Sequence, residues 1–139
     1  MTHASRNTTT GLTFEQYATM KENGINLTKN ELYNYLKKKK INWKTLLSRK
    51  LLPDEAYFNP STGELHVYEK KFQQTAGSAD EKIQTCAFKI LQYKKLGKAI
   101  GATKVTYTYL LSKWFEQPMY RDALDYIKTV DDCDYIIME

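Results

Sequence analysis

Apolar and polar positions in the middle of the chain predict a β-hairpin and a further strand. Residues 55–58 and 64–72 are expected as the two strands of the hairpin. The residues between them are those that turns require: Asn59, Pro60, Ser61, Thr62 and Gly63. Residues 103–111 are rich in valine, threonine and tyrosine, which is the composition of a strand. This part of the chain is therefore expected to contribute at least three strands.

Helix starts are marked by hydroxyl residues that are followed three positions later by glutamate or glutamine. Such a pair can cap the free backbone amides of a first helical turn. The pairs are Thr13 with Gln16, Thr28 with Glu31, and Ser78 with Glu81. They predict a helix that ends near Asn23-Gly24, a second helix over residues 29–40, and a third that ends near Gly97 or Gly101.

The remaining segments give weaker signals. Pro118 is expected to precede a last helix over residues 119–130. Residues 134–138 are expected to form a short strand or a tail. Residues 41–52 fit a helical turn as well as an extended segment, so both readings stay open.

Length and composition predict one globular domain, and the expected helices and strands make it α/β with a mixed sheet. The chain has 139 residues, of which 42% are hydrophobic, enough for a single core. Residues 1–10 are polar and are expected to form a flexible tail, which leaves residues 11–139 as the domain. Trp43 and Trp114 are expected to lie in its core.

A surplus of basic residues favours a polyanionic partner such as nucleic acid. The chain has 21 lysines and arginines against 16 aspartates and glutamates, for a net charge of +5. The densest basic segment contains Lys37, Lys38, Lys39, Lys40, Lys44, Arg49 and Lys50. These residues are expected to neutralise phosphates, and a solvated helix end is the alternative.

Cysteines and histidines are too few and too scattered for a zinc site. Cys86 and Cys133 lie far apart in the sequence, as do His3 and His66. This usage predicts a reducing, cytoplasmic location. The first residues lack the apolar core of a signal peptide or anchor, so no membrane association is expected. A glycine-rich phosphate loop is also missing, which argues against a nucleotide-dependent enzyme.

The second strand of the predicted hairpin ends in two opposite charges. Alternation along a strand places Glu69 and Lys71 on the same face as Leu65 and Val67, which should be buried. A buried carboxylate and ammonium are costly unless they serve each other or a bound ion. Asp54 supplies a second carboxylate from the facing strand. Two carboxylates with waters and a phosphate oxygen can hold Mg²⁺.

The order Pro53-Asp54, a hairpin, then Glu69-Lys70-Lys71 resembles the signature of the PD-(D/E)XK nuclease superfamily. The resemblance implies a restriction-endonuclease-like core, in which a central mixed sheet carries a catalytic β-hairpin and is flanked by helices. It also implies that Asp54, Glu69 and Lys71 are catalytic. Asp54, Glu69 and the backbone carbonyl of Lys70 would bind Mg²⁺, for which Mn²⁺ can substitute.

Further acids are candidates to complete such a site. Superfamily members often add a glutamate from the first helix, and Glu31 or Glu15 could serve here. Glu31 has an alternative role as the return arm of a helix cap. Glu55 neighbours Asp54, but strand alternation is expected to turn it to the opposite face.

Glutamines after the motif are also candidates. Some members of the superfamily carry a glutamine followed four residues later by a tyrosine. In this chain Gln84 is followed by Phe88, so the amide is present without the hydroxyl, and a polar helix face is an equal alternative. Gln73 and Gln74 follow the motif directly and could contact the nucleic-acid backbone or bases.

These observations together predict a metal-dependent DNA endonuclease, most simply of restriction type, which would act as a homodimer where both strands are cut. A Holliday-junction resolvase-like or other structure-selective nuclease fits the same residues. A non-catalytic nucleic-acid-binding protein, in which Glu69 and Lys71 form a structural ion pair, is the alternative from another class. A protein-interaction module is a third.

Overall fold

The computed structural model describes the backbone of residues 3–72 and 79–138, and the side chains of residues 13–72 and 80–138. In chain order its elements are α1 (His3–Asn23), β1 (Ile25–Asn26), α2 (Asn30–Lys38), β2 (Glu55–Asn59), β3 (Glu64–Lys71), α3 (Ala79–Ile83), α4 (Cys86–Ala99), β4 (Lys104–Ser112), α5 (Arg121–Thr129) and β5 (Cys133–Met138). Short 3₁₀ turns occur at Trp43–Thr45, Lys113–Glu116 and Pro118–Tyr120.

The five strands of the described ranges form one mixed sheet in the order β1-β2-β3-β4-β5. β1, β2 and β3 are antiparallel neighbours, whereas β3, β4 and β5 run parallel to one another. Parallel neighbours need a crossover, which α3 and α4 supply between β3 and β4, and α5 supplies between β4 and β5. The expected α/β class with a mixed sheet and flanking helices is therefore confirmed.

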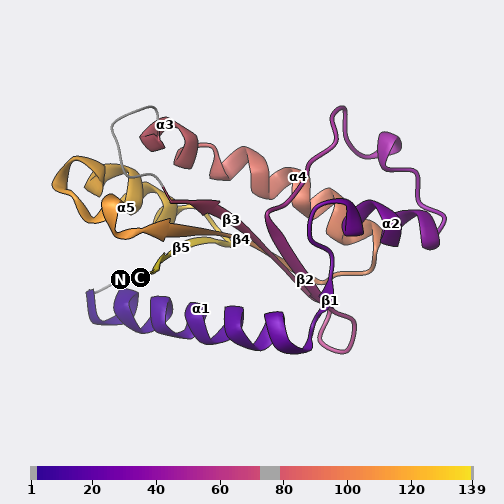
Figure 1. Cartoon of the computed structure of the whole chain (residues 1–139), viewed down its shortest axis with the longest axis horizontal. Helices are drawn as coiled ribbons and strands as arrows, with labels where there is room; N and C mark the ends of the chain where they lie inside the picture. The colour runs from indigo at the N-terminus through magenta and orange to yellow at the C-terminus, as the bar shows by residue number, and fades with distance from the viewer. Residues whose placement is uncertain (1–2, 73–78, 139) are drawn as a thin grey trace.

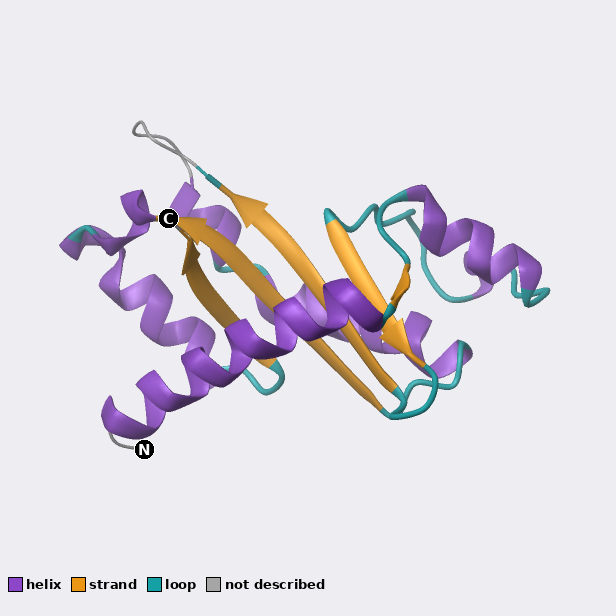
Figure 2. Cartoon of the chain, turned by 60° about the horizontal axis from the view of Figure 1, so that its bottom comes forward, coloured by secondary structure: helices purple, strands orange, loops and turns teal. Residues whose placement is uncertain are grey.

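Helices cover both faces of this sheet. α1 lies along one face and α4 along the other (Figure 1), and in Figure 2 α1 crosses in front of the strands. The core under α1 is small and consists of Tyr17, Met20, Tyr57, Tyr68, Leu110 and Ile136. The opposite face holds the larger core, where α2, α4 and α5 pack against the strands. Among the described residues, no helix is both long and apolar enough to cross a membrane.

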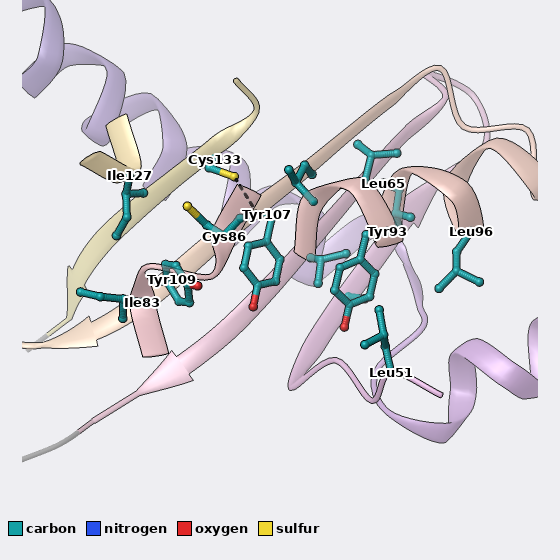
Figure 3. Packing of buried hydrophobic residues seen from close by; sticks show 14 of the residues in the cluster. Leu51, Leu65, Ile83, Cys86, Tyr93, Leu96, Tyr107, Tyr109, Ile127 and Cys133 are labelled. Atoms are coloured by element: carbon teal, nitrogen blue, oxygen red, sulfur yellow. Dashed lines mark hydrogen bonds between the residues drawn. The ribbon is translucent and has the colours of Figure 1, made fainter. Parts of the chain in front are cut away.

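Aromatic rings and two thiols occupy the larger core (Figure 3). Tyr93 of α4 stacks on Tyr107 of β4 with ring centroids 5.7 Å apart, and Tyr107 meets the edge of Tyr109 at 5.2 Å. The thiol of Cys133 donates to the carbonyl of Cys86 at 3.7 Å, and both are buried free cysteines. Two residues far apart in the sequence therefore meet where α4 begins beside β5.

The predicted hairpin is confirmed to within one residue at each strand end. Gly63 adopts a φ of 76°, and its N–H donates to the carbonyl of Asn59 at 2.8 Å. A Cβ at Gly63 would lie 2.5 Å from Oγ1 of Thr103, so both the conformation and the space favour glycine. The predicted strand at residues 103–111 is found one residue later, as β4, and the segment expected as a strand or a tail forms β5, Cys133–Met138.

The first helix begins earlier than predicted, whereas the predicted starts of the second and third helices are found to within one residue, at Asn30 and Ala79. The hydroxyls of Thr13 and Thr28 do not cap helices, because tertiary contacts engage them. α1 begins at His3, so the backbone expected to form a tail is helical through residue 10. Thr13 donates instead to Oδ2 of Asp134 at 2.8 Å. Thr28 accepts the N–H of Ala56 at 3.3 Å, and α2 starts without a side-chain cap. A capping pair read from sequence cannot reveal a competing partner on a distant strand.

Two further expectations are corrected. The third predicted helix is interrupted, with α3 ending at Ile83 and α4 beginning at Cys86, and its predicted cap Ser78 lies outside the described residues. Trp43 and Trp114 are partly exposed rather than fully in the core. The ambiguous stretch at residues 41–52 contains only a 3₁₀ turn, within which Asn42 accepts the N–H of Lys44 at 3.1 Å.

Replacing Gly97 by alanine should lower the free energy of unfolding by about 1–3 kcal/mol, although alanine is the better helix former. A Cβ at Gly97 would lie 2.5 Å from Cγ2 of Val105, which is buried and branched and cannot easily move aside. Urea unfolding of Gly97→Ala measures the change. Lys95→Ala, at an exposed position of the same helix, is the control and should stay within about 0.5 kcal/mol of the wild type. An unchanged or raised stability for Gly97→Ala would contradict this close approach of α4 to β4.

Candidate active site

Asp54 and Glu69 face each other at one end of the β2–β3 hairpin. The antiparallel register pairs Glu55 with Tyr68, so one further step brings Asp54 opposite Glu69. The backbone N–H of Lys70 donates to Oδ2 of Asp54 at 2.8 Å. The structure therefore brings together the two acids that the sequence motif singled out, on the same face of the sheet.

Lys71 completes this group from the same strand. Its Nζ lies 3.4 Å from Oε2 of Glu69, and the two side chains are 27% and 23% exposed. Asp54 is 26% exposed. This partial exposure lets a ligand reach all three groups from solvent while the protein holds them in place.

Burial and like charge make the Glu69 carboxylate costly to ionise. Burial is the largest cause that raises the pKa of Glu69, and the neighbouring Asp54 carboxyl, within hydrogen-bonding reach, raises it further. The Lys71 ammonium opposes both effects but does not cancel them. Burial raises the pKa of Tyr93 and Tyr107, and the Glu69 charge adds to both shifts. These buried rings (Figure 3) are therefore within electrostatic reach of Glu69 and solvate charge poorly.

The approach to Asp54 is fixed by α2 and its first turn. The hydroxyl of Tyr33 donates to the carbonyl of Leu51 at 2.5 Å and accepts the N–H of the same residue at 2.7 Å. The N–H of Lys29 donates to the carbonyl of Pro53 at 2.9 Å, and the Lys29 ammonium lies 3.6 Å from Oδ1 of Asp54. These contacts order the segment that presents Asp54.

Glu55 lies on the opposite face, as strand alternation predicted. It is buried beneath α1, where it accepts hydrogen bonds from Tyr57 at 2.5 Å and Tyr17 at 3.1 Å. The Lys70 ammonium lies 3.1 Å from the same carboxylate. Burial by itself would raise the pKa of Glu55, but the hydrogen bonds from Tyr57 and Lys70 outweigh it and hold that pKa below its usual value. Because burial and Glu55 both disfavour the phenolate, the pKa of Tyr17 rises to about 12. Glu55 is therefore an anchor and not part of the exposed acidic pair.

Lys70 joins the two faces. Its N–H points to Asp54 on the side of the candidate site, and its side chain reaches Glu55 under α1. In a strand the N–H and the carbonyl of one residue point toward the same neighbouring strand. The Lys70 carbonyl is therefore directed toward the edge where Asp54 lies, which is the position required of a third oxygen ligand.

The auxiliary acids are not brought to this pair. Glu31 is exposed and accepts a hydrogen bond from Asn34 at 3.3 Å, so it neither contacts Asp54 nor closes the predicted cap. Glu15 is exposed on α1 and lines a hollow with Asn59. The hypothesis that one of them completes the site receives no support from these contacts.

The predicted glutamines fare similarly. Gln84 is exposed and lines a hollow of about 340 Å³ with Asp122 and Tyr126 of α5, a hollow that neither Asp54 nor Glu69 lines. Gln73 and Gln74 lie outside the described residues.

The predicted phosphate-binding residues are all exposed, at the end of α2 and in the segment after it: Lys37, Lys38, Lys39, Lys40, Lys44, Arg49 and Lys50. Three of them line a hollow of about 480 Å³ with Tyr33 and Trp43. Because Tyr33 also holds Leu51, this basic region and the approach to Asp54 are parts of one structural unit.

Two carboxylates and one backbone carbonyl suit a hard cation that keeps several waters. Among the described residues, no group of three or more histidine, cysteine, aspartate and glutamate side chains is arranged to hold a metal. Mg²⁺ is commonly bound by only one or two carboxylates, with waters and substrate phosphate as its other ligands. The residues present therefore fit Mg²⁺ and do not fit zinc.

Sequence reasoning missed three residues that build the site. Lys29 and Tyr33 position Asp54 from α2, and Tyr17 helps to hold Glu55 from α1. For Tyr33 the sequence gives only a weak indication of burial, because this residue is next to the apolar Leu32 in the predicted helix. No sequence pattern marks Lys29. Its backbone has a φ of 51°, which is uncommon for lysine, and its N–H donates to the carbonyl of Pro53.

Comparison with known proteins adds no relative: no family model, curated protein or solved structure matches the chain.

Replacing Glu69 by glutamine should raise the free energy of unfolding at pH 7 in metal-free buffer. The native pKa of Glu69 is raised, so its ionisation opposes folding as the pH rises from the ordinary glutamate pKa through the native one. Below that range the native carboxyl is already neutral, and the gain from Glu69→Gln should vanish. Urea unfolding at pH 4 and pH 7 tests both statements. A loss of stability at pH 7 would show that the ion pair with Lys71 outweighs burial and the repulsion by Asp54.

Replacing Glu55 by glutamine should change the free energy of unfolding in the opposite direction to Glu69→Gln. The native pKa of Glu55 is lowered, so its stabilising contribution is present at pH 7 and is lost as the pH falls through that native pKa. The variant should be less stable than the wild type at pH 7, and the difference should shrink under acid conditions. The same urea series measures it. Equal stability of the two proteins at pH 7 would contradict the anchoring role.

Proposed function

We propose that this protein is a Mg²⁺-dependent DNA endonuclease of the PD-(D/E)XK type. One observation carries the proposal: Asp54 and Glu69 are held opposite each other, with the Lys71 ammonium 3.4 Å from Glu69. Two acids and a lysine at the open end of a hairpin can hold a cation beside a phosphodiester. The order of elements is consistent with a restriction-endonuclease-like core, since α1 and three antiparallel strands are followed by a crossover to the parallel β4.

The raised pKa of Glu69 has a direct meaning under this proposal. A divalent cation between the carboxylates would favour their ionised forms and remove the electrostatic cost that the metal-free site carries. Asp54, Glu69 and the Lys70 carbonyl would hold Mg²⁺, which supplies a bound water of lowered pKa and positive charge next to the phosphate.

The other residues act on the substrate. Lys71 is placed to donate a hydrogen bond to the attacking water or to a phosphate oxygen as negative charge develops on it. Tyr93 and Tyr107 solvate charge poorly within electrostatic reach of Glu69, which strengthens its charge interactions. Tyr33 and Lys29 keep Asp54 in position.

Restriction-type cleavage of both strands is the form of the activity that we favour, with two copies of the chain acting together. The site presents one pair of acids per chain, which suits one strand per protomer. Cleavage of branched DNA by a junction resolvase uses the same chemistry and stays the alternative substrate. The buried free thiols of Cys86 and Cys133 suit a reducing compartment, so we place the activity in the cytoplasm.

A non-catalytic nucleic-acid-binding protein is the second candidate, because the contact between Glu69 and Lys71 is also a plausible structural ion pair. The two functions differ in what the acids do. In a non-catalytic binding protein, Asp54 and Glu69 hold no metal. The DNA then stays intact both with the wild type and with variants that lack either carboxylate.

Wild-type protein incubated with supercoiled plasmid and Mg²⁺ should convert it to nicked or linear DNA, and EDTA should stop the reaction. Lys71→Ala, Asp54→Asn and Glu69→Gln should each lower the rate by about 100-fold or more, since each removes a group that acts on the reacting phosphate. Glu22→Gln, which removes an exposed carboxylate of α1, is the control and should cleave at the wild-type rate.

Thermal unfolding gives a second readout that does not need the correct DNA substrate. Mg²⁺ should raise the melting temperature of the wild type and of Glu22→Gln but not that of Glu69→Gln. Binding of plasmid and branched DNA without cleavage of either, together with no thermal shift by Mg²⁺ or Mn²⁺, would establish the binding protein instead.

A further inference from the structure

The hollow at the end of α2 is a second site with its own chemistry. It encloses about 480 Å³ and is lined by Lys37, Lys40 and Lys50, by Asn42, and by the rings of Tyr33 and Trp43. α2, whose last turn contributes to this hollow, lies at the opposite end of the molecule from α5 (Figure 1).

Positive charge in this hollow is not neutralised. None of the residues that line it is an aspartate or a glutamate. Within the described ranges, Lys37, Lys40 and Lys50 have no carboxylate partner. Three ammonium groups around a concave surface repel one another, so an anion that enters between them relieves this repulsion.

Aromatic surface lies beside these charges. Trp43 is partly exposed and meets Tyr33 edge to face, with ring centroids 5.8 Å apart. The Lys50 ammonium lies 4.6 Å from the centroid of Tyr33 and 6.0 Å from that of Trp43. Lys50 is thus associated mainly with Tyr33, which leaves the indole as the surface for a flat ligand. A phosphate beside a planar base matches this combination, because bases stack on aromatic rings while lysines neutralise the backbone.

We propose that this hollow binds one unpaired nucleotide of a nucleic-acid strand, with its phosphate among the three lysines and its base against Trp43. This inference rests on the proposed nucleic-acid substrate, and it adds that the protein recognises unpaired nucleotides of that substrate. A paired base is not accessible to the indole, so the site favours a single-stranded or opened segment over intact duplex. Tyr33 links the two sites, since its ring lines the hollow and its hydroxyl holds Leu51, three residues before Asp54.

The test is a titration with a short oligothymidylate in EDTA, where no cleavage takes place. Trp114→Phe leaves Trp43 as the single tryptophan, and its emission should be quenched as the strand binds. Three controls should bind more weakly and quench the Trp43 emission little. They are an abasic strand of the same length, intact duplex and free thymidine monophosphate. Fluorescence anisotropy of a labelled oligothymidylate with the unmodified wild type measures affinity independently of the Trp114 substitution.

Matched double variants locate the contact. Lys37→Gln/Lys40→Gln should weaken oligothymidylate binding by about tenfold and reduce its salt dependence. Lys95→Gln/Lys98→Gln removes the same charge from exposed positions of α4 and should weaken binding much less. Equal losses in both variants, an unquenched Trp43 at saturation, or equal affinity for the abasic strand or the free mononucleotide would each overturn the proposal. Quenching by a protein that never cleaves with Mg²⁺ would refute the nuclease but keep this site, whereas cleavage with a silent Trp43 would refute only this site.

Discussion

The hydrogen bond from the Lys70 N–H to Asp54 holds the open end of the hairpin together. Asp54 comes one residue before β2, beyond the last residue pair of the strand ladder. A side chain there takes the place of a backbone acceptor and keeps the two chain segments in register. The proximity of Asp54 to Glu69, and the position of Lys71 beside them, both depend on this contact.

The two faces of the hairpin differ in whether they stabilise a negative charge. Under α1, Glu55 is buried but surrounded by donors, so its charge is stabilised. On the other face Glu69 has a neighbouring carboxylate and only one opposing ammonium, so its charge is disfavoured. Lys70 ties the faces to each other through its backbone and its side chain. The carboxylate with several hydrogen-bond donors, Glu55, thereby anchors the strand that carries Glu69, whose charge is poorly compensated.

α2 connects the candidate site around Asp54 with the basic hollow. Lys29, the residue before its first turn, holds Pro53, and Tyr33 within the helix holds Leu51. Its last turn contributes Lys37 to the basic hollow. A ligand in that hollow therefore contacts the same helix that positions Asp54. This gives the basic segment a specific place relative to the acids, which a diffuse positive charge on the surface would not have.

Local patterns were sufficient for much of the fold. The turn at residues 59–63 and the alternation after it determined the hairpin, because a turn with Gly63 at positive φ leaves the chain little alternative but to reverse. The same alternation placed Glu69 and Lys71 on one face and turned Glu55 to the other, since the period of a strand follows from its backbone geometry. By contrast, Thr13 and Thr28 suited helix caps locally but bind Asp134 and Ala56 across the fold.

The sequence by itself determined where β2, β3 and β4 lie to within one residue, and which acid and lysine of β3 share a face. Only the tertiary structure decided that Asp54 reaches Lys70, that Gln84 lines a hollow with α5, and that Cys86 meets Cys133. The physical reason is the range of the interactions. Strand period and turn conformation act between neighbours in the chain, whereas these contacts join segments that become neighbours only when the sheet and the helices pack together.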